Sequence, residues 1–557
     1  MGRKKSKKIT ITHGMRRSII IAIALLIIIF LINVAPNYVK EASQDGIRVI
    51  INNNNVTSHL KKKIVVQADK PYMSTADIQN FFDEFLTEEE NTIITTSNTK
   101  TVQISKVSNA MNINGANVKL ENSIVEEDNS VFLPVSEMAN VYNYEYSFSE
   151  NTLMIDSLNK KLVRATSAKD QSIKFKATEF SKSIEKIKRG DSVVIVQDSQ
   201  KNEDTEVDGY YKVRSKNGNI GYIKKSNLIG RTVVRDNLEQ EKIKGKVSLA
   251  WEYYNQYTAA PTKSAKIDGI NAVSPSFYEL KSDGSLVKNV SEEYIKWAHE
   301  SGYKVWPTVS NSSLNNLDSV SEIMSNFETR QNLIENIISS LIDAGVDGVT
   351  IDFENMYKED KDKYSRFIIE LVPRIKEMGM TTCVEVTEPD GSDTWSLCYD
   401  RNTIGKVADY VVFIGYGQHT GSSTSAGTVA GANWEEINIK KFLGQEGVPK
   451  EKLILAMPFY TRLWKEENGK LSSQVVNMNK ITIPSGIEKK WDNELKQNYI
   501  EYQSGNATYK MWIEDEESIS AKLDLVNQYD IVGAGFWEID RETAGVWNIV
   551  SNKLGVK

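Results

Sequence analysis

From residue 244 to the end of the chain, strand patterns alternate with helical ones, and this alternation constrains the fold more than any other feature. Short apolar runs recur eight times, at 245–254, 269–280, 303–311, 347–355, 380–388, 410–419, 452–464 and 531–540. Amphipathic helical patterns lie between them, as in 330–345 and 362–379. We therefore predict a (β/α)8 TIM barrel over 244–557, with an α+β insertion at 465–529 between the seventh and eighth strands.

The composition excludes several classes of protein. Of the 557 residues, 25% are charged and 40% hydrophobic, which is typical of folded domains. The net charge of -6 is small for this length and indicates no nucleic-acid partner. Only four His and two Cys are present, and no cluster has the spacing of metal ligands. We expect no metal ion and no other cofactor.

The N-terminus predicts a membrane anchor. Residues 1–17 carry seven Lys or Arg and no acid, and residues 18–35 form an uncharged apolar run. Such a run is long enough to span a hydrocarbon core, and the basic side stays cytoplasmic. We expect a cytoplasmic tail, a single-pass transmembrane helix and an extracytoplasmic remainder at the cell wall. A cleaved secretory signal is the alternative, although the run is long for one and no small-x-small site ends it.

Two small regions follow the predicted anchor. Residues 46–158 read as short strands with one short helix at 131–143. Their segment "INGANVKL…SVFLPVSEMANVYNYEYSFSENTLMI" resembles the small stalk domain at the N-terminus of copper amine oxidases and of many bacterial envelope proteins. That resemblance implies a spacer or adhesion module. It does not imply copper, because the region holds one His, His59, and no Cys.

The second small region, residues 165–235, alternates apolar and polar residues and turns at "NGN". The segment "GYYKVRSKNGNIGYIKKSNL" resembles a bacterial SH3 domain. That resemblance implies binding to cell-wall peptide or glycan. A small β-barrel spacer without a ligand remains the alternative.

The fourth strand of the predicted barrel carries unusual charges in the sequence "DGVTIDFEN". With a period of two, Thr350, Asp352 and Glu354 share one face, while the apolar residues between them face the opposite way. Active sites of such barrels lie at the C-terminal ends of the strands, so Glu354 should lie nearest the mouth. Burying charge is costly, which favours a functional role. A structural ion pair, with Arg462 as the partner, is the alternative.

Four segments of the barrel region resemble glycoside hydrolase family 18. "DGVTIDFE" matches the family signature Asp-Gly-x-Asp-x-Asp-x-Glu at every fixed position except Thr350. "YVVFIGYGQH", "PFYTRLW" and "GFWEID" match its Tyr, Tyr-x-Arg and Trp motifs on strands six to eight. "WIEDEESISAKLDLV" resembles the "W-x-E-D…S…K" segment of the bacterial branch that cuts spore cortex or cell-wall peptidoglycan.

The resemblance implies a role for each residue that matches the family motifs. Glu354 would be the general acid and then the general base, Asp352 would hold the N–H of the sugar's 2-acetamido group, and Tyr416 would hold its oxygen. Trp537 would form an apolar floor beneath the sugar. Further contacts with the substrate are expected from Arg462, Tyr460, Gln418 and Glu388. For the aromatic residues, packing at the barrel rim is the alternative.

Two positions depart from the family pattern. Thr350 replaces an Asp that lies beneath the middle Asp in many members, and its hydroxyl could still donate a hydrogen bond to Asp352. The peptidoglycan-cutting branch often lacks this Asp, so Thr350 favours that branch. Gly417 stands where an Asp that helps to grip the substrate usually follows the Tyr.

Together with the predicted anchor, the resemblance implies a membrane-anchored N-acetylglucosaminidase-type hydrolase of peptidoglycan that uses a retaining, substrate-assisted mechanism. The barrel does not distinguish peptidoglycan from chitin, so a chitinase is one alternative. A lectin-like cell-wall-binding protein with weak catalysis is another, for which Gly417 is the main argument.

Overall fold

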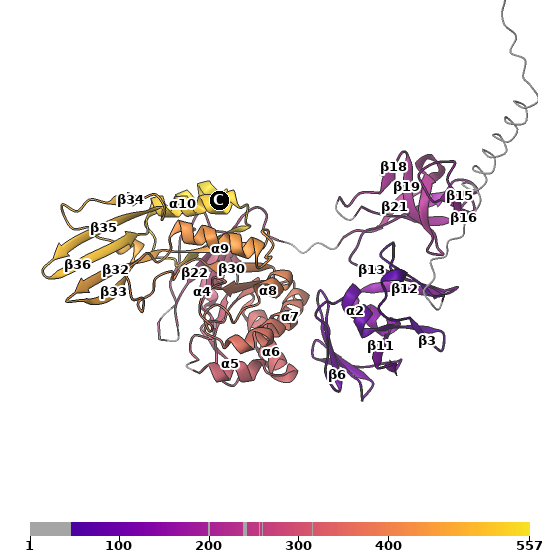
Figure 1. The fold of residues 1–557 in the computed structure, drawn as a ribbon, viewed down its shortest axis with the longest axis horizontal. Coiled ribbons are helices and arrows are strands. Elements are labelled where there is room, and N and C mark those ends of the chain that lie inside the picture. Colours follow the sequence, from indigo (N-terminus) through magenta and orange to yellow (C-terminus); the bar gives the residue numbers. More distant parts are fainter. Residues whose placement is uncertain (1–45, 199–200, 238–241, 256, 259, 315) are drawn as a thin grey trace, which may run out of the picture. The chain divides into compact units, whose positions relative to one another are not determined.

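The computed structural model describes residues 46–198, 201–237, 242–255, 257–258, 260–314 and 316–557 (Figure 1). By their contacts these residues form two compact units, one with residues up to 93, 104–111 and 118–239, the other with 94–103, 112–117 and 240–557. The predicted cytoplasmic tail and anchor, 1–17 and 18–35, lie outside the described residues. Across those that are described, no helix is both long enough and apolar enough to cross a membrane.

The first small region contains three sheets and two short helices. One sheet has the order β12 (Tyr144–Ser149), β13 (Thr152–Ser157), β1 (Arg48–Ile51), β2 (Asn54–Asn55). A second has the order β10 (Val125–Glu127), β11 (Ser130–Pro134), β4 (Lys70–Ser74), β3 (Val65–Gln67). The third runs in sequence through β5 (Thr87–Glu88), β6 (Thr92–Thr96), β7 (Thr101–Ser105), β8 (Ala110–Ile113) and β9 (Ala116–Lys119). The helices are α2 (Thr75–Phe81) and α3 (Val135–Tyr142), the latter within the segment that predicts a helix.

The second small region is a single curved antiparallel sheet with its own apolar core. Its strands are β14 (Leu162–Ser167), β15 (Gln171–Lys174), β16 (Ser183–Ile187), β17 (Ser192–Ile195), β18 (Glu206–Val207), β19 (Tyr210–Arg214), β20 (Ile220–Lys224) and β21 (Leu228–Arg235). Seven of them have the order β16-β15-β20-β19-β17-β14-β21, and β18 pairs with β19. Buried residues such as Val163, Ile173, Val213 and Ile223 meet on one face, which explains the alternating sequence pattern.

The predicted (β/α)8 barrel is confirmed. Its strands, in order around the barrel, are β22 (Val247–Glu252), β23 (Ala272–Pro275), a third strand in two pieces, β26 (Lys304–Val305) and β27 (Thr308–Ser310), then β28 (Gly348–Asp352), β29 (Thr381–Val386), β30 (Tyr410–Ile414), β31 (Leu453–Pro458) and β37 (Gly533–Trp537). The first strand, β22, pairs in parallel with both β23 and β37, so the barrel is closed. A short hairpin, β24 (Tyr278–Leu280) and β25 (Leu286–Lys288), pairs with β27.

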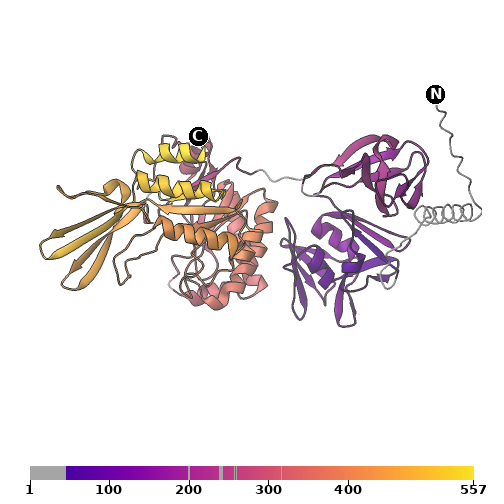
Figure 2. The same ribbon diagram turned by 45° about the horizontal axis from the view of Figure 1, so that its top comes forward.

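Helices cover the outside of the barrel. They are α4 (Glu292–Glu300), α5 (Leu317–Met324), α6 (Phe327–Ala344), α7 (Lys361–Glu377), α8 (Arg401–Val407), α9 (Ala432–Gly444), α10 (Glu516–Gln528) and α11 (Val546–Leu554). Helix α6 ends at Gly345, which has a φ of 66° and so takes a conformation that favours glycine. Helices α10 and α11, drawn in yellow, lie side by side against the barrel (Figure 2).

The barrel has two apolar layers. The outer layer joins the strands to the helices, with residues such as Val349, Ile351 and Leu371 in one buried cluster. The inner layer fills the barrel and contains Trp251, Trp306, Cys383 and Tyr410. Gly535 on β37 makes room for it, because a Cβ there would lie 2.5 Å from the ring of Trp251. The inner layer supports the polar groups at the carboxyl ends of the strands.

A five-stranded antiparallel sheet is inserted between β31 and α10 and extends away from the barrel helices (Figure 1). Its strands are β32 (Tyr460–Glu467), β33 (Lys470–Asn477), β34 (Lys490–Asp492), β35 (Gln497–Ser504) and β36 (Ala507–Ile513). This sheet differs from the predicted bounds 465–529 at both ends. The apolar run 452–464 is divided at Phe459, whose N–H bonds to the carbonyl of Trp537, and α10 packs into the outer layer of the barrel.

Candidate active site

The residues of β28 alternate between the two faces of the barrel wall, as the sequence predicts. Ile351 and Phe353 are fully buried in the layer beneath the helices. Because successive side chains of a strand point to opposite faces, Asp352 and the residues in phase with it point into the barrel. Asp352 is the last residue of the strand, and Glu354 follows two positions later at its carboxyl end. This is the end at which the active sites of such barrels form.

Thr350 has a different partner from the one the sequence suggests. Its hydroxyl donates a hydrogen bond of 3.1 Å to the main-chain carbonyl of Trp306, which lies between β26 and β27. A hydroxyl has one proton to donate, so the expected hydrogen bond to Asp352 is not made. Within the described part of the chain, Oδ1 of Asp352 is buried without a hydrogen-bond partner.

Burial perturbs both carboxyls in the same direction. It raises the pKa of Asp352 to about 7, because the charged form loses its hydration. Burial, and the nearby charge of Asp352, hold the pKa of Glu354 well above its usual range. Because the charge of Asp352 disfavours ionisation of Glu354 and both carboxyls are poorly hydrated, the pair retains a proton near neutral pH.

Two side chains fix the main chain around Glu354. Oδ1 of Asn311 accepts a 2.9 Å hydrogen bond from the N–H of Glu354, and Nδ2 of Asn311 donates a 2.8 Å hydrogen bond to its carbonyl. The hydroxyl of Tyr399 donates to the carbonyl of Phe353 at 2.7 Å. Sequence reasoning missed Asn311 and Tyr399 because their partners are backbone groups on other elements. For Asn311, the available signal is an Asn directly after a barrel strand.

A third carboxyl, Glu385 on β29, lies beside this pair and was also missed. Ile351 of β28 pairs with Val384 of β29, and Asp352 and Glu385 are the next residues of the two strands. Glu385 is 3% exposed, and Nε1 of Trp251 donates a 2.8 Å hydrogen bond to its Oε1. Burial and the charge of Asp352 hold the pKa of Glu385 well above its usual range.

Two tyrosines lie on the side of β30 and β31. Tyr416 follows β30, and its ring meets that of Tyr460 edge to face, with the centroids 6.2 Å apart. Burial holds the pKa of Tyr416 well above its usual range, with smaller contributions from Glu385 and Glu354. Its hydroxyl is therefore a proton donor at neutral pH, and it lies within electrostatic reach of the carboxyls.

Trp537 lies at the end of β37, the strand that pairs with β31. Its ring centroid lies 6.3 Å from that of Trp251 and 6.1 Å from that of Tyr253. The side chain is partly exposed and packs on the inner apolar layer. Trp537 thus presents an aromatic surface at the mouth of the barrel.

The remaining three predicted site residues have partners within the protein. Oε1 of Gln418 accepts a 2.9 Å hydrogen bond from the N–H of Gly431, at the start of α9. Nη1 of Arg462 donates a 3.0 Å hydrogen bond to Oγ of Ser473 on the neighbouring strand β33. Among the residues that the structure describes, no ion pair joins Arg462 to the carboxyls of Asp352 and Glu354. Glu388 lies in the loop after β29, and burial raises its pKa.

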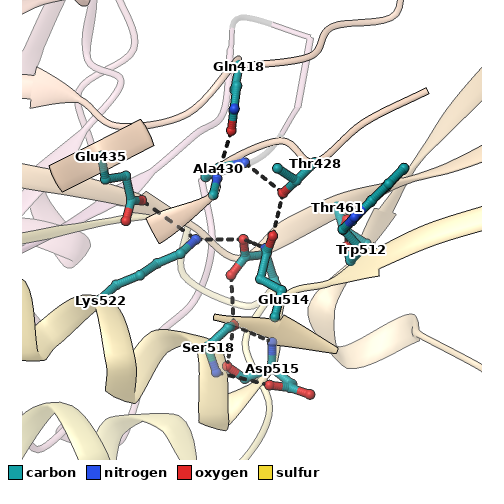
Figure 3. A network of polar contacts seen from close by, with 12 residues as sticks. Gln418, Thr428, Ala430, Glu435, Thr461, Trp512, Glu514, Asp515, Ser518 and Lys522 are labelled. Carbon is teal, nitrogen blue, oxygen red and sulfur yellow. Dashed lines mark hydrogen bonds and ion pairs between the residues drawn. The ribbon is translucent and has the colours of Figure 1, made fainter. Parts of the chain in front are cut away.

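A buried polar network holds the loop that follows Tyr416 (Figure 3). Nζ of Lys522 on α10 lies 2.6 Å from Oε1 of Glu514 and 3.6 Å from Oε1 of Glu435 on α9, and all three side chains are fully buried. Gln497 donates to Glu514 and accepts a 2.5 Å hydrogen bond from the hydroxyl of Thr428 in the loop. The "W-x-E-D…S…K" segment therefore joins the inserted sheet, α9 and α10 to the β30–α9 loop.

The fold and the site together define a class of protein. Acid-catalysed cleavage of a glycosidic bond needs a carboxylic acid that keeps its proton near neutral pH, and burial of Glu354 provides this condition. A second carboxyl and aromatic surfaces lie next to it at the carboxyl end of a (β/α)8 barrel. The protein is a glycoside hydrolase.

The chain belongs to glycosyl hydrolases family 18, whose family model matches residues 250–542, just over half of the chain. "Putative sporulation-specific glycosylase YdhD" of Bacillus subtilis is 28% identical over 236 residues, 41% of this chain and 55% of that protein. "Uncharacterized glycosylase YvbX" of the same organism is 24% identical over 293 residues, 50% of this chain and 84% of that protein. The "Cortical fragment-lytic enzyme" of Bacillus anthracis is 21% identical over 317 residues, 53% of this chain and 73% of that protein.

Proposed function

We propose that the protein is a membrane-anchored hydrolase that cleaves β-1,4 bonds next to N-acetylglucosamine in peptidoglycan and retains the anomeric configuration. The observation that carries this proposal is the half-buried pair of Asp352 and Glu354 at the carboxyl end of β28, whose pKa values are both raised. One carboxyl that keeps its proton and one that can ionise are the two groups that substrate-assisted hydrolysis uses.

In the first step Glu354 donates its proton to the glycosidic oxygen. The bond between the anomeric carbon and that oxygen breaks, and the carbonyl oxygen of the sugar's 2-acetamido group forms a new bond to the anomeric carbon. The product is an oxazolinium ion on the sugar and a free hydroxyl on the leaving glycan. Ionised Asp352 accepts a hydrogen bond from the acetamido N–H and offsets the positive charge.

In the second step Glu354, now a carboxylate, takes a proton from water as the water oxygen attacks the anomeric carbon. The oxazolinium ring opens, the acetamido group is restored and Glu354 is protonated again. Two inversions at one carbon give net retention. The hydroxyl of Tyr416 holds the acetamido oxygen during both steps, and the ring of Trp537 supports the apolar face of the sugar.

The choice of peptidoglycan rests on two supports. Two relatives from Bacillus carry the names sporulation-specific glycosylase and cortical fragment-lytic enzyme. The basic segment 1–17 and the apolar run 18–35 favour attachment of the protein at the cell's own wall. The two small β regions, which resemble a stalk domain and a bacterial SH3 domain, would carry the barrel away from the membrane and could bind the wall.

The test compares the full-length protein, purified in detergent, on peptidoglycan and on chitin oligosaccharides. We expect reducing ends to be released from peptidoglycan, and Glu354→Gln to lower kcat by about 10²- to 10⁴-fold. Glu359→Gln is the matched control, because Glu359 is exposed five residues further on and should leave kcat unchanged. A thiazoline analogue of N-acetylglucosamine should inhibit competitively, because it mimics the oxazolinium ion.

The alternatives give different outcomes in the same experiment. Faster cleavage of chitin oligosaccharides than of peptidoglycan would indicate a chitinase. Binding to the wall without release of reducing ends, equal in the wild type and in Glu354→Gln, would indicate a lectin-like protein. For the anchor, we expect the full chain to stay with bacterial membranes after alkaline extraction and a variant that lacks 18–35 to be released.

A further inference from the structure

The third carboxyl, Glu385, has no part in the two-step reaction, yet it lies beside both acids that do. Glu385 follows Val384 just as Asp352 follows Ile351 in the paired strands β28 and β29. Ile351 and Val384, which directly precede Asp352 and Glu385, belong to the outer layer. Because successive side chains of a strand point to opposite faces, both carboxyls point to the inner face. The two carboxyls are therefore neighbours across the strand pair.

The hydrogen bonds around Glu385 decide where its proton can lie. Nε1 of Trp251 is a donor only, and it donates to Oε1 of Glu385. Oε1 is therefore an acceptor, and a proton on the carboxyl group would be carried by Oε2. Across the strand pair, Oδ1 of Asp352 is buried and, among the described residues, has no hydrogen-bond partner. Oε2, which would carry the proton, and an Asp352 oxygen without a donor therefore belong to neighbouring residues on the inner face of the strand pair.

We propose that Glu385 is a positioning residue that stays protonated and donates a hydrogen bond from Oε2 to ionised Asp352, so that Asp352 can hold the acetamido group while Glu354 keeps its own proton. The proposal rests on the proposed function of this site. No proton is transferred in this step: the Oε2–H bond remains intact, and the carboxylate of Asp352 accepts. Trp251 orients Glu385 through Oε1 and also packs near Trp537, so the same indole supports the acid and the aromatic floor.

The groups around Glu385 agree with a protonated side chain. Burial raises the pKa of Glu385 most, and the charges of Asp352 and Glu354 raise it further, while the hydrogen bond from Trp251 lowers it. Its own charge acts in turn on Tyr416 after β30, Cys383 on its own strand and Tyr364 on α7. All three side chains are neutral at pH 7, so none of them supplies a positive charge that would stabilise an ionised Glu385.

The test uses two substitutions at position 385 that distinguish a hydrogen-bond donor to Asp352 from a side chain that only fills space. Glu385→Gln keeps an acceptor for Trp251 and an N–H donor for Asp352, whereas Glu385→Leu keeps neither. We expect Glu385→Gln to retain kcat/KM on peptidoglycan within about 3-fold and to keep the acid limb of its pH profile in place. Glu385→Leu should shift that limb upward by about one to two pH units, the worth of one hydrogen bond to a charged group.

Two results would overturn the proposal. If Glu385 were ionised, Glu385→Gln would remove a negative charge and move the acid limb to lower pH. If it only filled space, neither substitution would move the limb. Asp409→Asn is the control for general destabilisation, because Asp409 is a buried carboxyl that bonds to the N–H of Thr382 at the other end of the barrel wall. We expect it to lower Tm without moving the limb.

A second measurement needs no turnover and separates this proposal from the proposed function. Ionised Asp352 lacks a donor in Glu385→Leu but not in Glu385→Gln, so the Tm difference between these variants should widen from about pH 5 to about pH 8. Adding Asp352→Asn to both should abolish the widening. A Tm difference that does not change with pH would contradict the role of Glu385, even if the enzyme is active. A Tm difference that widens with pH in a protein that does not hydrolyse glycans would contradict only the proposed function.

Discussion

Asn311 and Glu354 are joined by two reciprocal hydrogen bonds, in which the side-chain amide of Asn311 pairs with both main-chain groups of Glu354. Asn311 is 7% exposed and directly follows β27, the strand next to β28. The arrangement fixes the backbone from which the proposed acid projects. It leaves the carboxyl itself free to meet a substrate.

Asn311→Ala should therefore lower kcat strongly while it lowers Tm only slightly. Loss of both hydrogen bonds lets the backbone at Glu354 move, and a small misplacement of an acid costs about 10- to 100-fold in rate. Steady-state kinetics on peptidoglycan, with Tm measured in parallel, would test this. Asn402→Ala is the control, because Asn402 makes a single exposed hydrogen bond to the carbonyl of Glu446. Equal losses of kcat in the two variants would contradict the prediction.

The pH profile of kcat/KM should be bell-shaped. Asp352 must ionise to accept the acetamido N–H, and its pKa of about 7 in the free protein places the acid limb near neutral pH. The alkaline limb reports loss of the proton from Glu354. In Asp352→Asn the charge that helps to raise the pKa of Glu354 is absent, so the alkaline limb should move to lower pH. The residual rate should be about 10²- to 10³-fold lower.

Profiles measured for the wild type and Asp352→Asn over the same pH range would check both statements. The conservative variant Asp352→Glu is the control, because it keeps a charge near Glu354 and should leave the alkaline limb where it is. An alkaline limb that stays in place in Asp352→Asn would mean that the two carboxyls do not interact. An unchanged rate would remove Asp352 from the mechanism.

The sequence predicts what depends on local periodicity. The strand–helix alternation correctly predicts the barrel, and the period of two in 347–355 correctly places Ile351 and Phe353 beneath the helices. Glu385 was missed, although the same alternation puts it in phase with Cys383 on the inner face, because its proximity to Asp352 depends on the pairing of two strands far apart in sequence. The partner of Thr350 could not be predicted either, since the carbonyl of Trp306 is a main-chain group between β26 and β27.

The predicted contacts of Gln418 and Arg462 illustrate the same limit. Both residues follow barrel strands in sequence, which favours a place in the groove. In the structure Gln418 bonds to Gly431 at the start of α9, and Arg462 bonds to Ser473 within the inserted sheet. Their roles in substrate binding remain predictions.

Lys522→Met should destabilise the barrel strongly. Glu514 and Glu435 would lose the cation that stabilises their charged forms in a fully buried network, and breaking such a group costs about 3 to 5 kcal/mol. Burial already raises the pKa of Glu435 to about 8, and without Lys522 both pKa values would rise further. A carboxyl that stays protonated in the folded state costs stability as pH rises above its pKa in the unfolded chain. Wild-type Glu435 already does so up to about pH 8, so the extra loss in Lys522→Met should grow with pH through Glu514 and, above about pH 8, through Glu435 as well.

Urea denaturation, followed by tryptophan fluorescence at several pH values, would measure this loss. Lys510→Met is the matched control, since Lys510 pairs with Glu466 at 3.0 Å where both side chains are partly exposed, and its removal should cost less than about 1 kcal/mol. A similar, pH-independent cost for both lysines would show that the buried network adds no special stability.

The backbone conformation at position 417 favours glycine, and this explains why no acid follows Tyr416 in this chain. Its φ is 91°, a conformation that L-residues rarely adopt, although no atom lies within 4 Å of where a Cβ would be. We expect Gly417→Ala to lower the free energy of unfolding by about 1 to 2 kcal/mol. In Gly444→Ala the Cβ is equally unobstructed, but no such φ is required, so this control should be neutral or slightly stabilising.

Restoring the acid by Gly417→Asp should carry the same backbone penalty and shift Tyr416, so kcat/KM on peptidoglycan should fall rather than rise. Unfolding and steady-state kinetics of the variants Gly417→Ala, Gly417→Asp and Gly444→Ala would separate the two effects. If Gly417→Asp raised kcat/KM about tenfold or more, the glycine would be a lost substrate contact, and the lectin-like alternative would gain its main support. If it lowers kcat/KM together with Gly417→Ala, the backbone at this position explains the departure from the family pattern.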